Sequence, residues 1–108
     1  MITVRLYKTK TGDIYGFSID SHGKDIVCAA VSILAQNTVN SIEKFTGDRF
    51  ECDYEGSGGH LKFEHTVIKS GGCSRDASLL LNSMALGLYG IQDEYKKEIK
   101  IFTEVNHD

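Results

Sequence analysis

A long amphipathic segment between two pairs of short alternating segments is the sequence feature that most constrains the fold. From about Asp25 to Phe45, side chains suited to a core recur at intervals of three and four residues, which is the spacing of one buried helix face. This stripe consists of Val27, Val31, Leu34, Thr38, Ile42 and Phe45, and is widened by Ile26, Ala30 and Ile33. Asp25 is a favoured N-cap residue, and Gly47 is a typical C-terminal stop. The pattern therefore predicts a helix with one broad buried face.

Strands are predicted on both sides of this helix, because apolar and polar residues alternate there with a period of two. The alternating segments are residues 2–7, 14–19, 49–55, 60–67 and 99–105. Turn residues at 11–13 and the glycine-rich 56–59 join the first four into two hairpins. A second amphipathic helix is predicted up to about Tyr95, with Ser74 or Asp76 as its cap. The order ββαββαβ predicts one α+β domain spanning residues 1–108, with both helices on one face of a largely antiparallel sheet.

The overall charge and composition argue against several classes of partner. The net charge is −3 and the pI is near 5.8, so the chain lacks the basic footprint of a protein that binds nucleic acid directly. No run approaches the roughly 18 apolar residues of a membrane span. The three cysteines are an odd number without a Cys-x-x-Cys pair. A reduced, cytoplasmic setting is therefore expected.

The connection between the second strand and the first helix is the strongest candidate for chemistry. The strand ends at about Asp20, His22 follows in a short polar turn, and Cys28 falls in the first helical turn after Asp25. The partial positive charge at a helix N-terminus favours a thiolate, which is the reactive form of cysteine. A nearby imidazole is the usual activating base of such a thiol. This spacing indicates a Cys28/His22 pair, although plain packing of a small residue beside Ala29 remains the structural alternative.

The other cysteines and histidines are less favoured for a catalytic role. Cys52 lies on the apolar side of a predicted strand and is interpreted as an inert core thiol. Cys73 precedes the second helix, outside its cap, and is a weaker rival of Cys28 for reactivity. His65 shares a face with apolar residues and is interpreted as a packed, hydrogen-bonded histidine, whereas His60 is expected on the solvent-exposed face.

Several motifs in the chain resemble one known family. These are Asp-Ile-Val-Cys-Ala-Ala-Val-Ser at 25–32, Asn40-x-Ile42-Glu43 in the same helix, the Gly58-Gly59 turn, and the helix from Leu79-Leu80-Leu81 to Tyr95. Together they look like the ribosomal-processing cysteine proteases of Firmicutes and related bacteria. The resemblance covers nearly the whole chain, and the eight-residue run is its specific part.

The resemblance implies a two-layer homodimer that removes the N-terminal extension of ribosomal large-subunit protein twenty-seven. Cleavage after paired aromatic residues, by a Cys/His pair without metal or cofactor, is implied as well. By position, Cys28 matches the nucleophile, and Asp25 and Ser32 match supporting residues: Asp25 by capping and orienting, Ser32 one turn beyond the thiol. The residues of the substrate cleft are not identified by the sequence.

The position of the family's histidine allows two alignments. Members typically show Gly-His-Ala, a loop, and then Gly-x-Asp-Ile-Val-Cys, and the corresponding stretch here is shorter by about six positions. In one alignment, Ser21-His22 is the family's Gly-His and the loop is shortened. In the other, His22 is the residue before the last loop glycine, and the chain as given lacks the Gly-His. We favour the first, because Ile19-Asp20 leads into His22 as the strand does in the family.

Two other functions stay open alongside the protease. A non-catalytic, ribosome-associated interaction module would use the same surface but carry a thiol of ordinary reactivity. A metal site made from Cys28, His22 and a distant ligand such as His60 is the third hypothesis, although its spacing matches no structural zinc pattern.

Overall fold

The computed structural model describes residues 1–21, 25–55 and 59–106, which form five strands and three helices. In chain order the elements are β1 (Ile2–Lys8), β2 (Ile14–Asp20), α1 (Ile26–Thr46), β3 (Phe50–Glu55), β4 (His60–His65), α2 (Thr66–Lys69), α3 (Arg75–Glu94) and β5 (Ile99–Val105). The predicted order ββαββαβ is confirmed, with one short helix added. That helix corrects the sequence-based bounds, because the strand expected to continue to Val67 ends at His65.

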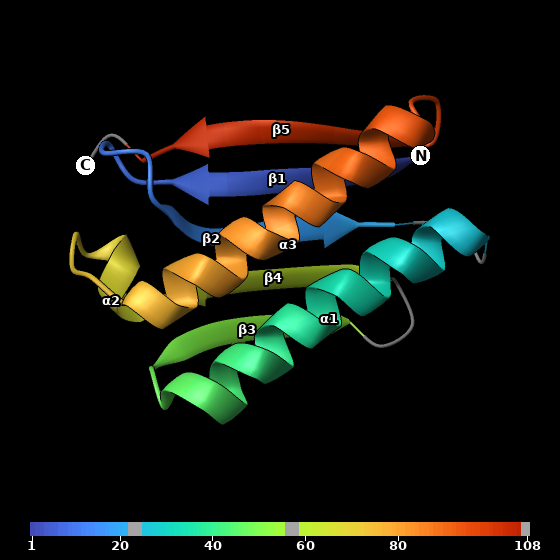
Figure 1. Ribbon diagram of the computed structural model, residues 1–108. Helices are drawn as coiled ribbons and strands as arrows, with labels where there is room; N and C mark the ends of the chain where they lie inside the picture. Colours follow the sequence, from blue (N-terminus) through green and yellow to red (C-terminus); the bar gives the residue numbers. More distant parts are fainter. Residues whose placement is uncertain (22–24, 56–58, 107–108) are drawn as a thin grey trace.

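All five strands belong to one sheet in the order β3-β4-β2-β1-β5 (Figure 1). The β1–β2 and β3–β4 hairpins are antiparallel, and β2 pairs antiparallel with β4 to join them. β5 adds to β1 in parallel at one edge. The sheet is therefore largely antiparallel, and β3 forms its other edge.

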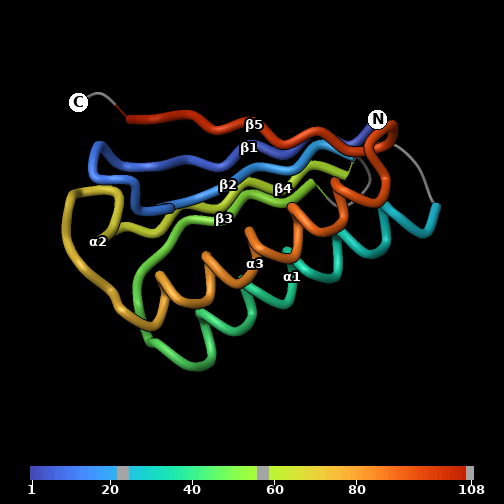
Figure 2. Tube along the Cα trace, turned by 45° about the horizontal axis from the view of Figure 1, so that its top comes forward, coloured from blue at the N-terminus to red at the C-terminus, as the bar shows by residue number. Residues whose placement is uncertain are grey.

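Both long helices lie on the same face of the sheet (Figures 1 and 2). Cross-strand partners share a face, and the core residues Val4, Ile19 and Leu61 stand in register across β1, β2 and β4. These apolar side chains face the helices and form the core together with Val31, Ile42, Phe63, Met84, Leu88 and others. The predicted two-layer α+β class is confirmed.

Helix α1 has the predicted ends but a narrower buried face than expected. Gly47 ends the helix at φ 69°, a left-handed conformation that glycine adopts without steric cost. The buried residues are Val27, Val31, Ala35, Thr38, Val39 and Ile42. Ile26, Ile33 and Phe45, which the sequence pattern placed on the buried side, are each more than two-thirds exposed. The buried residues of α1 belong to the core shared with the sheet, and α3 packs along a second side of the helix, so the outer side of α1 remains uncovered.

Helices α1 and α3 approach closely at a glycine. A Cβ atom added to Gly87 would lie 2.7 Å from Cδ2 of Leu34. Gly87 therefore serves the packing of the two helices within the chain. Gly90, the other glycine of α3, has open space where a side chain would stand.

The edge strand β3 is less covered than the strands beside it. Phe50 is half-buried and its ring centroid lies 5.1 Å from that of Phe63. Cys52 and Tyr54, which follow on the same face, are exposed. The interpretation of Cys52 as a core thiol is therefore wrong: it shares a face with its cross-strand partner Phe63, but its side chain stays exposed on the edge strand.

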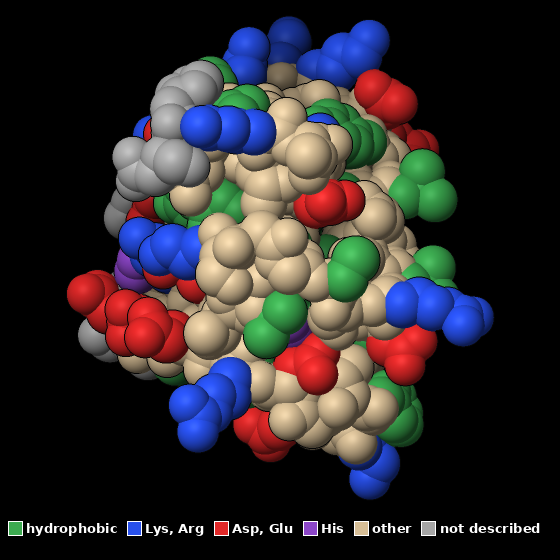
Figure 3. Space-filling view, turned by 90° about the vertical axis from the view of Figure 1, so that its left-hand side faces the viewer, with side chains coloured by type: hydrophobic (Ala, Val, Ile, Leu, Met, Phe, Trp, Pro, Cys, Tyr) green, Lys and Arg blue, Asp and Glu red, His purple; other side chains and the backbone are tan. Residues whose placement is uncertain are grey.

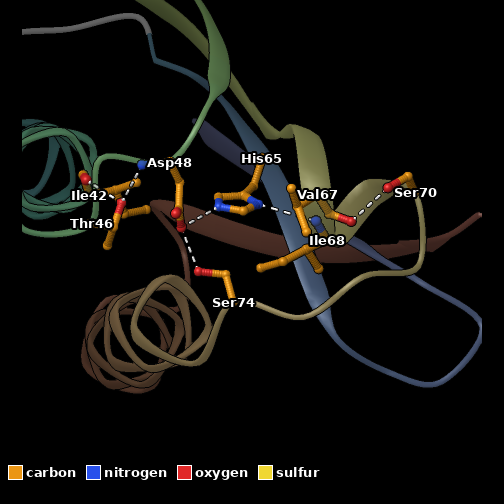
Figure 4. A network of polar contacts seen from close by, with 8 residues as sticks. All are labelled: Ile42, Thr46, Asp48, His65, Val67, Ile68, Ser70 and Ser74. Carbon is orange, nitrogen blue, oxygen red and sulfur yellow. Dashed lines mark hydrogen bonds and ion pairs between the residues drawn. The ribbon is translucent and has the colours of Figure 1, made fainter.

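A polar network at His65 ties the end of β4 to α2, α3 and the residues that follow α1 (Figure 4). His65 is fully buried, and its Nδ1 accepts a hydrogen bond from the N–H of Ile68. Nε2 therefore carries the proton, and it donates to Oδ2 of Asp48 over 2.9 Å. Ser74, one of the two predicted cap residues, is the N-cap of α3. Its side chain makes no capping hydrogen bond, because its hydroxyl donates to the same carboxylate oxygen of Asp48 instead. The interpretation of His65 as a packed, hydrogen-bonded histidine is confirmed.

The end of the molecule that carries the β1–β2 turn and α2 is a mixed charged surface. Figure 3 shows Lys and Arg side chains interspersed with Asp and Glu on this face, and hydrophobic side chains only in small separate groups. None of the helices in the described part of the chain is long and apolar enough to cross a membrane.

The network at Asp48 predicts a pH-dependent loss of stability. Hydrogen bonds from Ser74 and His65 lower the pKa of the Asp48 carboxyl below its ordinary value of 3.8. A lowered folded-state pKa stabilises the fold above the unfolded-state value, and this contribution is lost as the pH falls through the folded-state pKa. We expect Asp48→Asn to cost about 1–2 kcal/mol at pH 7, because it removes charge-assisted hydrogen bonds. Urea denaturation at pH 7 and at pH 2.5 tests this; an equal cost at both values would contradict it.

Candidate functional site

The first turn of α1 holds Cys28 by its backbone. Asp25 has an extended conformation, with φ −82° and ψ 176°, and its Oδ1 accepts a hydrogen bond from the Cys28 N–H over 2.9 Å. The predicted N-cap is thus confirmed. Because the first N–H groups of a helix lack partners within it, the carboxylate satisfies one of them and fixes the start of the helix. Cys28 therefore stands at a defined place in the first turn.

The thiol of Cys28 is half-buried and meets the end of β2. Its Sγ donates to the hydroxyl oxygen of Ser21 over 3.2 Å. Ser21 directly follows the last residue of β2 and is itself buried. Sequence analysis placed a base and a nucleophile at this connection but assigned no role to Ser21. The spacing of seven residues across a turn contained no signal for this contact.

A groove of about 280 Å³ extends from Ser21 between α1 and the adjoining ends of β2, β3 and β4. Its lining residues are Ile19, Ser21, Ser32, Ile33, Ala35, Gln36, Tyr54, Gly59, His60 and Leu61. Ile19 and Leu61 contribute apolar surface from the sheet, while exposed Tyr54 contributes an aromatic ring from the edge strand. Most of the lining is apolar, which suits an apolar side chain of a bound peptide.

The α1 side of the groove carries a polar stripe. Cys28, Ser32 and Gln36 are spaced by four residues and therefore lie on one side of the helix. Ser32, the predicted supporting residue, is exposed and lines the groove one turn beyond the thiol. Gln36 was missed by sequence analysis, although the four-residue spacing from Cys28 was a signal that points to it.

His22, the predicted base, lies outside the described residues. Its two described neighbours in sequence are Ser21, which accepts from the Cys28 thiol, and Asp25, which accepts from the Cys28 N–H. The segment that contains His22 therefore begins and ends at residues that touch Cys28.

The two other histidines of the described chain have structural partners. His60 Nδ1 lies 2.6 Å from Oδ1 of Asp20, and Arg5 lies 3.7 Å from the other oxygen of that carboxylate. Asp20 and His60 are cross-strand partners that alternate with core residues, so they face the side of the sheet without helices. The predicted solvent-facing position of His60 is confirmed. His65 has both ring nitrogens occupied in the Asp48 network, away from Cys28.

The two remaining cysteines differ from Cys28 in their surroundings. Cys73 is exposed just before α3, at the end of the molecule opposite the start of α1 (Figure 1). Although Cys52 is exposed, partial desolvation by its neighbours and, second, the nearby charge of Asp53 raise the pKa of its thiol. Both effects disfavour the thiolate of Cys52.

No metal centre is formed by the residues that the structure describes. Across 1–21, 25–55 and 59–106, no group of three or more His, Cys, Asp or Glu side chains is arranged to hold a metal ion. The proposed ligand set of Cys28, His22 and His60 includes a residue outside these ranges.

Comparison with known proteins points to one family. The family model described as cysteine protease Prp matches residues 1–100. The ribosomal processing cysteine protease Prp of Staphylococcus aureus (strain Mu50 / ATCC 700699) is 32% identical over 108 residues, covering 94% of this chain and 97% of that protein. The protein of the same name from Bacillus subtilis (strain 168) is 29% identical over 84 residues, covering 78% of this chain and 75% of that protein.

Solved structures agree with these sequence matches. The crystal structure of an essential ribosomal processing protease Prp from S. aureus with a covalently linked product peptide has a TM-score of 0.85 and 30% identity. The structure of that protease with a substrate peptide has a TM-score of 0.85 and 28% identity. Each alignment covers 96% of this chain and all of the other.

The cap of α1 can be tested separately from any activity. Asp25→Ala removes the acceptor of the Cys28 N–H, so we expect the free energy of unfolding to fall by about 1 kcal/mol. Asp25→Asn, which keeps an acceptor oxygen, is the matched control and should lose less. Urea denaturation monitored by circular dichroism gives both values. Equal stability of Asp25→Ala and the wild type would contradict the role of the cap.

Proposed function

This chain belongs to the cysteine protease Prp family, and on that premise we propose that it removes the N-terminal extension of a large-subunit ribosomal protein. The substrate precursor would be ribosomal protein twenty-seven, cut after a pair of aromatic residues. The names of its relatives include ribosomal processing, and the two S. aureus structures hold a substrate and a product peptide. The observation that carries the proposal is the Cys28 thiol in the first turn of α1, hydrogen-bonded to a residue that lines an apolar groove.

In the proposed reaction Cys28 is the nucleophile and His22 is the base. His22 takes the thiol proton, the sulfur attacks the scissile carbonyl carbon, and His22 returns the proton to the leaving amine. Water then hydrolyses the resulting thioester and releases the N-terminal product. The short segment between Ser21 and Asp25 supports His22 in this role, because both flanking residues contact Cys28.

Backbone groups of the first helical turn serve as the oxyanion hole in this proposal. The N–H groups at a helix start point along the helix axis toward the same space as a side chain of the first turn. Preorganised donors of this kind stabilise the negative charge that develops on the carbonyl oxygen. Asp25 supports them by fixing where the helix starts.

The groove is the proposed site for an aromatic side chain of the substrate. Ile19, Leu61 and Tyr54 supply apolar and aromatic contacts, and a phenyl ring is of a size that such a groove holds. Ser32 and Gln36 supply polar groups along the α1 side for the peptide backbone. The groove begins at Ser21, so a side chain bound there lies close to the bond that Cys28 attacks.

We expect Cys28→Ala to abolish cleavage while leaving the fold intact. The change trims one small, half-buried side chain, whereas removing a catalytic nucleophile lowers kcat/KM by at least about 10³-fold. The assay follows a peptide with two adjacent phenylalanines, with an alanine pair in the same peptide as the substrate control. Circular dichroism melting checks the fold.

Cys73→Ala is the matched control for this experiment. It removes an exposed thiol at the opposite end of the molecule and should keep full activity. His22→Ala should lose activity as Cys28→Ala does. Unchanged turnover by Cys28→Ala would refute the assignment, and absence of turnover by the wild type would favour a non-catalytic ribosome-associated module.

We also propose that the chain forms a homodimer in a reducing compartment such as the cytoplasm. The uncovered sides of α1 and α3 carry exposed apolar residues outside the groove, among them Phe45, Leu79 and Leu86. Burying such residues against a second copy would remove apolar surface from water. Sedimentation equilibrium is expected to show a dimer that Leu86→Asp weakens at least tenfold. A wild type that stays monomeric at the highest concentration examined would contradict this.

A further inference from the structure

We propose that Ser21 is a positioning residue for Cys28, holding the sulfur at the mouth of the groove and stabilising its anion. This inference rests on the proposed function, since it concerns the same nucleophile. Its basis is the contact of 3.2 Å between the Cys28 Sγ and the Ser21 hydroxyl.

Ser21 is restrained by the backbone of Gly59, the residue before β4. The Ser21 backbone N–H donates to the carbonyl oxygen of Gly59 over 2.8 Å. Gly59 has φ 66°, and a Cβ added there would lie 2.1 Å from the Ser21 carbonyl oxygen and 3.0 Å from its hydroxyl oxygen. The close approach of the Gly59 backbone therefore restricts both the main chain and the side chain of Ser21. The hydroxyl is preorganised beside the thiol.

The sulfur is fixed from its own side as well. The Asp25 carboxylate holds the Cys28 N–H over 2.9 Å, so the start of the helix sets the direction of the Cys28 side chain. Ser21 comes from the end of β2 and Asp25 from the start of α1. Two elements of the fold thus converge on one residue.

A hydroxyl at this position can serve both protonation states of the thiol. A serine has one O–H donor and two acceptor lone pairs, and its hydrogen rotates to suit its partner. With the thiol protonated, Sγ–H donates to the Ser21 oxygen, as the structure shows. Once the proton has moved to the base, the Ser21 O–H turns and donates to the sulfur anion. Hydrogen bonds to a charged partner are roughly twice as strong as neutral ones, so Ser21 favours the anion.

Ser21 also connects the sulfur to the groove. It is one of the groove's lining residues, yet its side chain is buried and directed to Cys28. The hydrogen bond therefore keeps the sulfur at the end of the groove where a bound peptide would pass. Loss of the hydroxyl should affect turnover more than peptide binding, so kcat falls while KM stays nearly unchanged.

The test is the rate at which Cys28 reacts with iodoacetamide between pH 5.5 and pH 10. It uses a Cys52→Ala/Cys73→Ala background, so that a single thiol remains. We expect Ser21→Ala to lower the rate about fivefold at pH 6.5, with rates that converge near pH 10, because charge-assisted hydrogen bonds favour the ionised form. The control is Ser18→Ala, which removes the hydroxyl of a buried serine within β2 that accepts from Tyr7 instead.

Melting temperatures of both serine variants show whether the fold is retained, and Ser21→Gly provides a second variant without the hydroxyl. The proposal would be overturned if Ser21→Ala had the same pH–rate profile as Ser18→Ala and as the background protein with both serines intact. A faster reaction of Ser21→Ala at pH 6.5 would overturn it as well. The readout does not require peptide cleavage. Peptide cleavage by the Cys28→Ala variant would refute Cys28 as the nucleophile, whatever the alkylation profiles show.

Discussion

The contact between the end of β2 and the first turn of α1 is the interaction on which the site depends. Asp25 holds the Cys28 N–H and Ser21 accepts from its thiol, so the same cysteine is fixed by the residues at both ends of one short connection. Neither contact would form without the packing of α1 on the sheet. The buried residues of α1 from Val27 to Ile42 belong to the core, and their packing sets the position and direction of the helix relative to β2.

The sheet topology contributes the rest of the site. β4 pairs with β2, so the Gly59 backbone at the start of β4 reaches Ser21 at the end of β2. β3 follows at the sheet edge, where α1 no longer covers it completely. The resulting incomplete cover leaves Tyr54 exposed and opens the groove beside the thiol. The groove is thus a consequence of a helix layer with two long helices resting on a five-stranded sheet.

Much of the fold follows from local patterns in the sequence. Period-two alternation gave the strands, and three- and four-residue spacing with Asp25 and Gly47 at its ends gave α1 nearly to the residue. Errors arose where burial depends on neighbours in space. Cys52 and Ile33 have apolar patterns, but whether another element covers them is decided by helix placement, which periodicity does not encode. The short helix α2 depends on His65 as its cap, a role that is set by the Asp48 network.

The candidate site was predictable only where it is formed by residues that are close together in the sequence. The cap and the position of Cys28 are local to one helix start and were found, whereas Ser21, Gly59 and the groove come from three segments that meet only in the folded chain. The most direct test of Cys28 as nucleophile is peptide mapping after treatment with a chloromethyl ketone whose peptide ends in two phenylalanines. The account predicts one adduct per chain, on Cys28, formed in proportion to the loss of cleavage. An adduct on Cys52 or Cys73, or full modification of Cys28 with cleavage retained, would contradict it.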